Sequence, residues 1–111
     1  MPAVIMTDSE LEKKPADITN RCLQMLDTAI EYYKENAPEQ AEILKQHFFK
    51  SVRLLEVMPG IGTKHKDGMK KIQLGKFRRY NIYYREKENE IEILGIWHTS
   101  RGTEFEEKGD E

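Results

Sequence analysis

The chain has 111 residues and a net charge of −2, and we expect residues 1–111 to form one domain around one hydrophobic core. No apolar run approaches the roughly 20 residues of a membrane-spanning helix, so we expect no membrane partner. The N-terminal residues lack the basic region of a signal peptide. A single cysteine, Cys22, excludes an internal disulfide, and together these features are typical of a cytoplasmic protein.

The N-terminal segment, residues 1–16, does not follow one pattern. Residues 3–6 could form a short strand, and a polar segment continues to Pro15. Asp17 is a plausible N-cap for a first helix that ends near Asn36. Apolar residues at helical spacing predict this helix: Ile18, Cys22, Met25, Ala29 and Tyr33, flanked by Leu26 and Ile30.

A second helix follows after a short break. Pro38 suits the first position of a helix, where its missing N–H is not needed, and Pro59 with Gly60 ends the helical pattern. The break is short enough for the two helices to pack as an antiparallel hairpin. The second apolar stripe consists of Ala41, Leu44, Phe48, Val52 and Leu55, broadened by Ile43 and Phe49.

Three strands are predicted in the remaining sequence, after a turn with the letters PGIG at residues 59–62. This turn lacks the spacing of a phosphate-binding loop. We therefore expect an α+β fold, with an N-terminal helical hairpin packed on a small, mostly antiparallel sheet. The acidic tail, residues 102–111, is expected to be frayed. The predicted strands cover residues 69–74, 78–85 and 91–98, with a tight turn at Gly75 and Lys76.

Basic residues concentrate in the strands. Between residues 64 and 85 there are eight Lys or Arg residues and one acid, Asp67, so this stretch carries +7 in a protein of net charge −2. Such segregation favours an anionic target on one face of the sheet, with nucleic acid as the first candidate. The alternative is a solvated face that prevents edge-to-edge aggregation. His47 and His65 have no metal-ligating neighbours at useful spacing, so we expect no metal and no cofactor.

Four motifs in this order resemble the RelE/ParE superfamily of toxins from bacterial type II toxin–antitoxin systems. The resemblance covers about two thirds of the chain and implies two helices packed on a four-stranded, largely antiparallel sheet. It also implies a cognate antitoxin protein as partner. The motifs are YYKENAP at residues 32–38, LEVMPGIG at 55–62, GMKKIQL at 68–74, and YNIYYR at 80–85 followed by ILGIWHTSR at 93–101.

The resemblance implies one of two activities. RelE-like members cleave mRNA in the ribosome, whereas ParE-like members poison DNA gyrase and have no known hydrolytic centre. Of the cationic positions of RelE-like members, Lys71 and Arg101 keep a cation here, but Gln73 and Asn81 are neutral amides. The catalytic residues of an endonuclease would be Lys71, Arg79, His98 and Arg101, with His98 as the acid or base.

The incomplete endonuclease set favours the ParE-like, gyrase-binding activity. The ribosome-dependent endonuclease stays as the alternative, and a non-toxic relative that only binds its antitoxin is a further one. We expect the antitoxin in an apolar groove along the helical hairpin, with Phe49 and Val52 at its rim. The predicted target-binding residues are Lys70, Lys76, Arg78, Tyr83 and Arg85.

Overall fold

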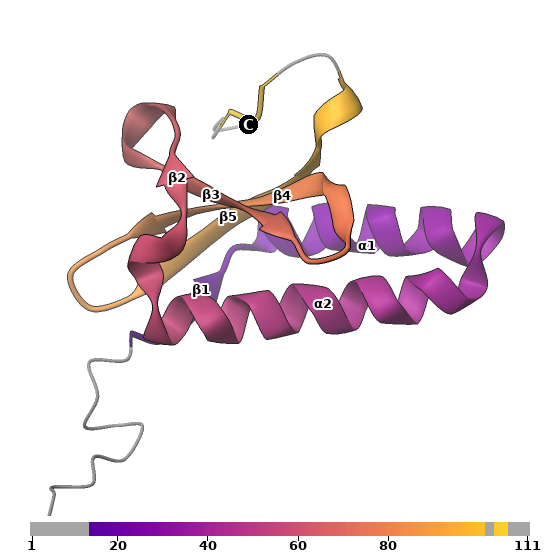
Figure 1. Cartoon of the computed structure of the whole chain (residues 1–111), viewed down its shortest axis with the longest axis horizontal. Coiled ribbons are helices and arrows are strands. Elements are labelled where there is room, and N and C mark those ends of the chain that lie inside the picture. The colour runs from indigo at the N-terminus through magenta and orange to yellow at the C-terminus, as the bar shows by residue number, and fades with distance from the viewer. Residues whose placement is uncertain (1–13, 102–103, 107–111) are drawn as a thin grey trace, which may run out of the picture.

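Two α-helices run antiparallel and cover one face of a five-stranded sheet (Figure 1). The computed structural model describes residues 14–101 and 104–106. The elements in chain order are β1 (Ala16–Ile18), α1 (Asn20–Asn36), α2 (Pro38–Val57), the 3₁₀ turn η1 (Pro59–Ile61), β2 (Thr63–Lys64), η2 (Lys66–Gly68), β3 (Lys70–Leu74), β4 (Phe77–Glu86), β5 (Ile91–His98) and η3 (Thr99–Arg101).

The predicted α+β class is confirmed, and the sheet is mixed. Its strand order is β1-β5-β4-β3-β2, and every neighbouring pair is antiparallel except β1 with β5. The first strand is β1, at Ala16–Ile18, whereas the strand considered at residues 3–6 lies outside the described residues. Within the described part of the chain, neither helix is long and apolar enough to cross a membrane.

The prediction that Asp17 caps the first helix is wrong. Asp17 lies in β1, where it is paired with Glu92 of β5, and the N-cap is Thr19. The Thr19 hydroxyl accepts a hydrogen bond from the Cys22 amide at 3.1 Å, as expected of an N-cap side chain. Because β1 continues up to Ile18, the helix begins after Thr19.

The other helix boundaries are confirmed. The first helix ends at Asn36, Ala37 separates the helices, and Pro38 opens α2. Both helices bury their apolar stripes against β3, β4 and β5, which places the main core between the two layers. Cys22 is fully buried there, and its burial raises the pKa of its thiol to about 12, so this thiol is a core side chain with no tendency to ionise at neutral pH.

A β-bulge in β5 explains its apolar residues on both faces. Tyr83 pairs with Gly95 but Tyr84 pairs with Ile93, so Leu94 is an extra residue in the strand. Ile93 and Ile96 therefore both face the helices, although they are three positions apart in the strand. Leu94 instead packs in a second, smaller cluster on the outer face of the sheet.

The expectation of a frayed tail is wrong for residues 104–106, while residues 102–103 and 107–111 lie outside the described residues. Phe105 is fully buried on the outer face of the sheet, in the cluster with Met69, Tyr83 and Leu94. Its ring stacks on Tyr83 with centroids 4.7 Å apart, and Arg21 lies 4.9 Å from its centroid. A Cβ atom at Gly95 would collide with Phe105, so only glycine leaves room for this ring. Below, "the C-terminal segment" means residues 104–106.

Candidate functional site

The eight basic residues between 64 and 85 fall into two groups. Lys66, Lys70 and Arg85 each lie within 4 Å of at least one carboxylate. Charges paired in this way present little net positive potential to a partner. Within residues 14–101 and 104–106, the other five form no ion pair: Lys64, Lys71, Lys76, Arg78 and Arg79.

The paired cations hold distant segments together. Lys66 lies 3.0 Å from Glu106 and 3.6 Å from Glu104, which fixes the C-terminal segment to η2. The hydrogen bond from Lys66 to Glu106 raises the pKa of the lysine. The ring nitrogen Nε2 of His65 lies 3.0 Å from the carbonyl oxygen of Phe105 and holds the same segment. These contacts occupy cations that would otherwise be available to a target.

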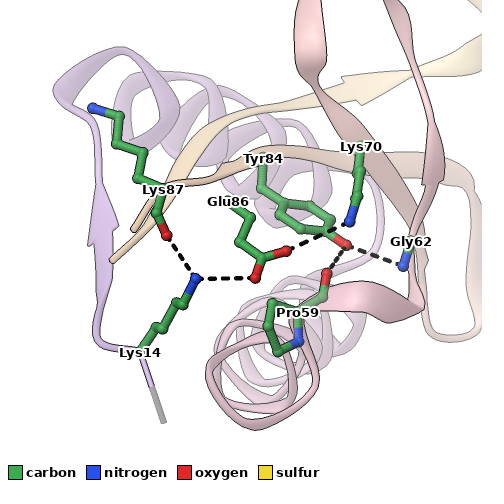
Figure 2. Close-up of polar contacts among 7 residues, drawn as sticks. All are labelled: Lys14, Pro59, Gly62, Lys70, Tyr84, Glu86 and Lys87. Atoms are coloured by element: carbon green, nitrogen blue, oxygen red, sulfur yellow. Dashed lines mark hydrogen bonds and ion pairs between the residues drawn. The ribbon is translucent and has the colours of Figure 1, made fainter. Parts of the chain in front are cut away.

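A polar cluster at the end of the sheet where β3 begins and β4 ends, which we call the clamp, holds Lys70 (Figure 2). Glu86 lies 3.0 Å from Lys14 and 3.5 Å from Lys70, and the hydrogen bond from Lys14 lowers the pKa of Glu86. Beside it, the Tyr84 hydroxyl donates to the Pro59 carbonyl at 2.7 Å and accepts from the Gly62 amide at 3.0 Å. The clamp comprises Lys14, Pro59, Gly62, Lys70, Tyr84 and Glu86.

The clamp shows what the PGIG turn does in this fold. A Cβ atom at Gly62 would collide with the Tyr84 hydroxyl, so glycine is needed for the loop to approach the tyrosine. The turn is therefore anchored by a buried side chain from β4 and links α2 to β2. This agrees with the prediction that the motif is a structural turn.

Three of these five unpaired cations, Lys76, Arg78 and Arg79, lie at the opposite end of β3 and β4, around the β3–β4 turn. Leu74 pairs with Phe77 across this turn, but the next pair is Gln73 with Asn81, so three residues of β4 have no partner on β3. In a regular strand, side chains alternate, and Arg78 and Arg79 would lie on opposite faces of the sheet. The irregular register interrupts this alternation. Both arginines line one hollow of about 280 Å³ together with Lys76.

We call this cavity the turn hollow. Its remaining lining comes from the helical hairpin, from β4 and from the end of β5, and none of the described residues that line it is a carboxylate. Tyr33 lies edge-on to Phe77, with ring centroids 5.7 Å apart, which connects α1 to the turn. Gly75 has a φ of +50°, as the tight turn requires. The lining residues are Tyr33, Gln40, Lys76, Phe77, Arg78, Arg79, Tyr80 and His98.

The structure divides the predicted endonuclease residues. His98 pairs with Tyr80, whose ring lies 4.8 Å away on the helix side of the sheet, and Arg79 lines the same hollow. Lys71 pairs with Tyr83 and therefore lies on the outer face. Arg101 belongs to η3, but its side chain lies outside the described part of the chain.

The environment of His98 sets its tautomer. Its Nδ1 atom accepts the Ser100 amide N–H at 3.2 Å and lies 2.6 Å from the Ser100 hydroxyl. The neutral imidazole therefore carries its proton on Nε2.

On the outer face, the two neutral amides Gln73 and Asn81 are paired across β3 and β4, and Asn81 donates to the Tyr83 hydroxyl at 3.5 Å.

The predicted target-binding residues also separate. Lys76 and Arg78 are exposed and unpaired among the described residues, whereas Lys70 and Arg85 are paired with Glu86 and Glu92. Tyr83 was also predicted to bind the target, but it is only 4% exposed because Phe105 covers its ring. Sequence reasoning missed both lining residues that the helical hairpin contributes to the turn hollow, Tyr33 and Gln40, because no local pattern connects the hairpin to the β3–β4 turn.

A groove between α1 and α2 forms a second surface. Its volume is about 300 Å³, and Phe49 lines it as expected. The expectation for Val52 is wrong, because this side chain is buried in the core beneath α2. The apolar lining of the groove consists of Leu23, Leu26, Ile30, Ala41 and Phe49, with charges of both signs around it. Among the described residues, no group of three or more His, Cys, Asp or Glu side chains could hold a metal ion.

Comparison with known proteins identifies a family. The model for the ParE toxin of the type II toxin–antitoxin system parDE matches residues 16–102. The structure is also similar to a solved chain described as a chromosomal ParDE toxin–antitoxin system from P. aeruginosa, with a TM-score of 0.71 and 22% sequence identity. That alignment covers 80% of this chain and 99% of the other, and it supports the fold. A search of curated protein sequences finds no match.

Proposed function

The chain belongs to the ParE toxin family of type II toxin–antitoxin systems, and from that premise we propose that it arrests growth by binding DNA gyrase. The proposed contact surface is the β3–β4 turn, with Lys76, Arg78 and Arg79. The observation that carries this assignment is that these cations are unpaired among the described residues and line one hollow without a carboxylate. Unpaired cations gathered in one place steer an anionic partner toward that place.

The division of the endonuclease residues supports binding over hydrolysis. Cleavage of an RNA phosphodiester needs an acid, a base and a charge-stabilising cation around one phosphate. Here His98 lies on the helix side of the sheet and Lys71 on the outer face. A phosphate bound beside His98 would therefore lie on the opposite side of the sheet from Lys71. Gln73 and Asn81 add no charge to the outer face.

Membership of a type II toxin–antitoxin family implies an antitoxin partner. We place the antitoxin on the groove between α1 and α2, where Leu23 is 38% exposed and Phe49 is partly buried. An apolar groove with charges of both signs at its edge suits an amphipathic segment that folds on binding. The turn hollow lies on a different part of the molecule, so the proposed antitoxin and gyrase surfaces share no lining residue.

Growth after induced expression, together with gyrase supercoiling by purified protein, tests the proposal. The double variant Arg78→Ala/Arg79→Ala should lose growth arrest and inhibit supercoiling at least about tenfold less well, since it removes two charges from the contact. The control Lys50→Ala/Lys64→Ala removes the same charge from exposed positions that line neither the turn hollow nor the groove. It should inhibit like the unmodified protein, and equal losses in both variants would contradict the proposed surface.

A second measurement separates the alternatives. In cell-free translation of purified mRNA no DNA is present, so gyrase cannot affect the result. Ribosome-dependent cleavage ends in the message would overturn the gyrase proposal in favour of the endonuclease. Intact message, normal growth and normal supercoiling would together identify a non-toxic relative that binds only its antitoxin.

A further inference from the structure

A second hollow adjoins the turn hollow and has a different chemistry. Its volume is about 360 Å³, and it lies along α1 next to the ends of β4 and β5. Three residues, Tyr33, Tyr80 and His98, line both hollows and form their common wall. We call this cavity the aromatic hollow, and its lining residues are Met25, Thr28, Ala29, Tyr32, Tyr33, Tyr80, Ile96 and His98.

We propose that the two adjoining hollows form a binding site for a nucleoside phosphate, with the phosphate in the turn hollow and the base in the aromatic hollow. The ligand class follows from the contrast between the two linings. Among the described residues, one side offers three cations, and the other offers tyrosine rings and aliphatic side chains with no Asp, Glu, Lys or Arg. A nucleotide has the same division, with an anionic group joined to a flat aromatic ring.

The phosphate half of the site depends on Arg78 and Arg79. Guanidinium groups bind phosphate oxygens through paired N–H donors, and Lys76 adds a point charge. The amide of Gln40 provides a neutral donor from the helical side of the hollow. Since no carboxylate lines this hollow in the part of the chain that the structure describes, an anion entering it displaces no ion pair among those residues. By contrast, an anion that reached Lys70 would have to compete with Glu86.

The base half of the site depends on tyrosines from α1. Tyr32 is 58% exposed, and its ring lies edge-on to the ring of Tyr33, with centroids 5.3 Å apart. This contact with Tyr33 holds the exposed Tyr32 ring in place. Every base can stack on an exposed tyrosine ring, and such stacking contributes about 1–3 kcal/mol per base. Volumes of about 280 and 360 Å³ leave room for a phosphate group and a single base, respectively.

This inference goes beyond the proposed gyrase contact, and the two can fail separately. Isothermal titration of the purified full-length chain contains no gyrase, no ribosome and no antitoxin. ADP should bind saturably, adenosine and inorganic phosphate should each bind at least about tenfold more weakly, and binding of ADP should weaken with salt. A 5′-phosphorylated trinucleotide distinguishes the source of the ligand. Tighter binding than ADP indicates the end of a nucleic-acid strand, and equal or weaker binding indicates a free nucleotide.

Variants on exposed positions test the two halves one at a time. Arg78→Ala/Arg79→Ala should weaken ADP binding at least about tenfold, since it removes two charged donors. Tyr32→Ala should weaken ADP binding about fivefold or more while leaving inorganic phosphate binding unchanged. Lys50→Ala/Lys64→Ala is the control for net charge and should bind ADP normally.

Three results would overturn the proposal. The first is the absence of saturable ADP binding by a protein with a normal thermal melt. The second is equal weakening by the control variant, which would indicate general attraction of anions. The third is evidence against the base half of the site. It would be given either by inorganic phosphate binding as tightly as ADP or by ADP binding that is unchanged in Tyr32→Ala.

Discussion

The clamp and the β3–β4 turn lie at opposite ends of the same strands and hold their cations differently. At the clamp, Lys14 and Lys70 lie 3.0 and 3.5 Å from the carboxylate of Glu86. At the turn, Arg78 and Arg79 line a hollow in which none of the described lining residues is a carboxylate. Both ends belong to one basic stretch of sequence, so a run of like charge does not define one surface. The acids that neutralise part of it come from elsewhere in the chain.

This comparison assigns stability to one end and binding to the other. Charges that are paired stabilise the fold in which they meet, whereas unpaired charges gathered in one place stabilise a complex. Substitutions at the clamp and beneath the C-terminal segment should therefore lower the free energy of unfolding. Substitutions at the turn should affect binding alone.

The largest expected effect on stability is at Phe105. Phe105→Ala should lower the free energy of unfolding by about 3 kcal/mol, because a fully buried ring is replaced by a cavity beside Tyr83. Urea denaturation of the full-length chain measures it, with Phe105→Leu as a milder control that keeps most of the apolar volume. A loss below about 0.5 kcal/mol, typical of surface sites, would mean that the C-terminal segment is frayed, as the acidic composition of the tail suggests.

The next effect is at the anchor of the PGIG turn. Tyr84→Phe should destabilise the protein by about 1–2 kcal/mol, because the Pro59 carbonyl and the Gly62 amide both lose their partner. Tyr32→Phe provides a matched control, since Tyr32 is exposed and its hydroxyl should contribute little. Chemical denaturation of both variants gives the comparison. Equal midpoints for the two would show that water replaces the Tyr84 hydroxyl at no cost.

Much of the fold is predictable because it depends on local patterns. The 3.6-residue spacing of apolar side chains and Pro38 predict both helices, and alternation predicts the central part of β4. The misses depend on contacts between residues far apart in the chain. The strand β1 has only three residues and is defined by its partner β5, and Phe105 is a single apolar residue in an acidic tail.

The candidate site could be predicted only in part, because some of its features also depend on contacts between residues far apart in the chain. Lys76 and Arg78 are exposed basic residues of a hairpin, which a sequence can indicate. That Arg78 and Arg79 share one hollow depends on an irregularity in the register of β4, and strict alternation predicts the opposite. The pairing of Lys70 and Arg85 depends on Glu86 and Glu92, whose positions across the sheet follow only from the register.

A smaller effect is expected at Glu86, and it depends on pH. The pKa of this carboxyl is lowered in the folded protein by Lys14 and Lys70, so its contribution to stability is present above the ordinary value of 4.5. This contribution is lost as the pH falls through the lowered folded value. Glu86→Gln should therefore cost about 0.5 kcal/mol at neutral pH, because the partly exposed pairs are screened by water and salt.

The cost of Glu86→Gln should shrink toward zero in acid, where the unmodified protein has also lost the charge. Urea denaturation at neutral pH and well below 4.5 measures both values. Glu88→Gln is the control, since Glu88 is exposed and forms no ion pair with the described residues. A cost of Glu86→Gln that stays the same at both pH values would show that the pairs with Lys14 and Lys70 contribute nothing.

The smallest effect on stability is expected at the turn itself. Arg78→Ala/Arg79→Ala should leave the free energy of unfolding unchanged, or raise it by about 0.3 kcal/mol, because it relieves repulsion among cations around one hollow. The gain should be largest at low ionic strength, where charges about 10 Å apart are less screened. Denaturation at low and high salt measures this change. A loss above about 1 kcal/mol, beyond the usual range for surface positions, would make the arginines part of the fold. That result would remove the contrast with the clamp, because growth arrest and nucleotide binding in this variant would then report on folding.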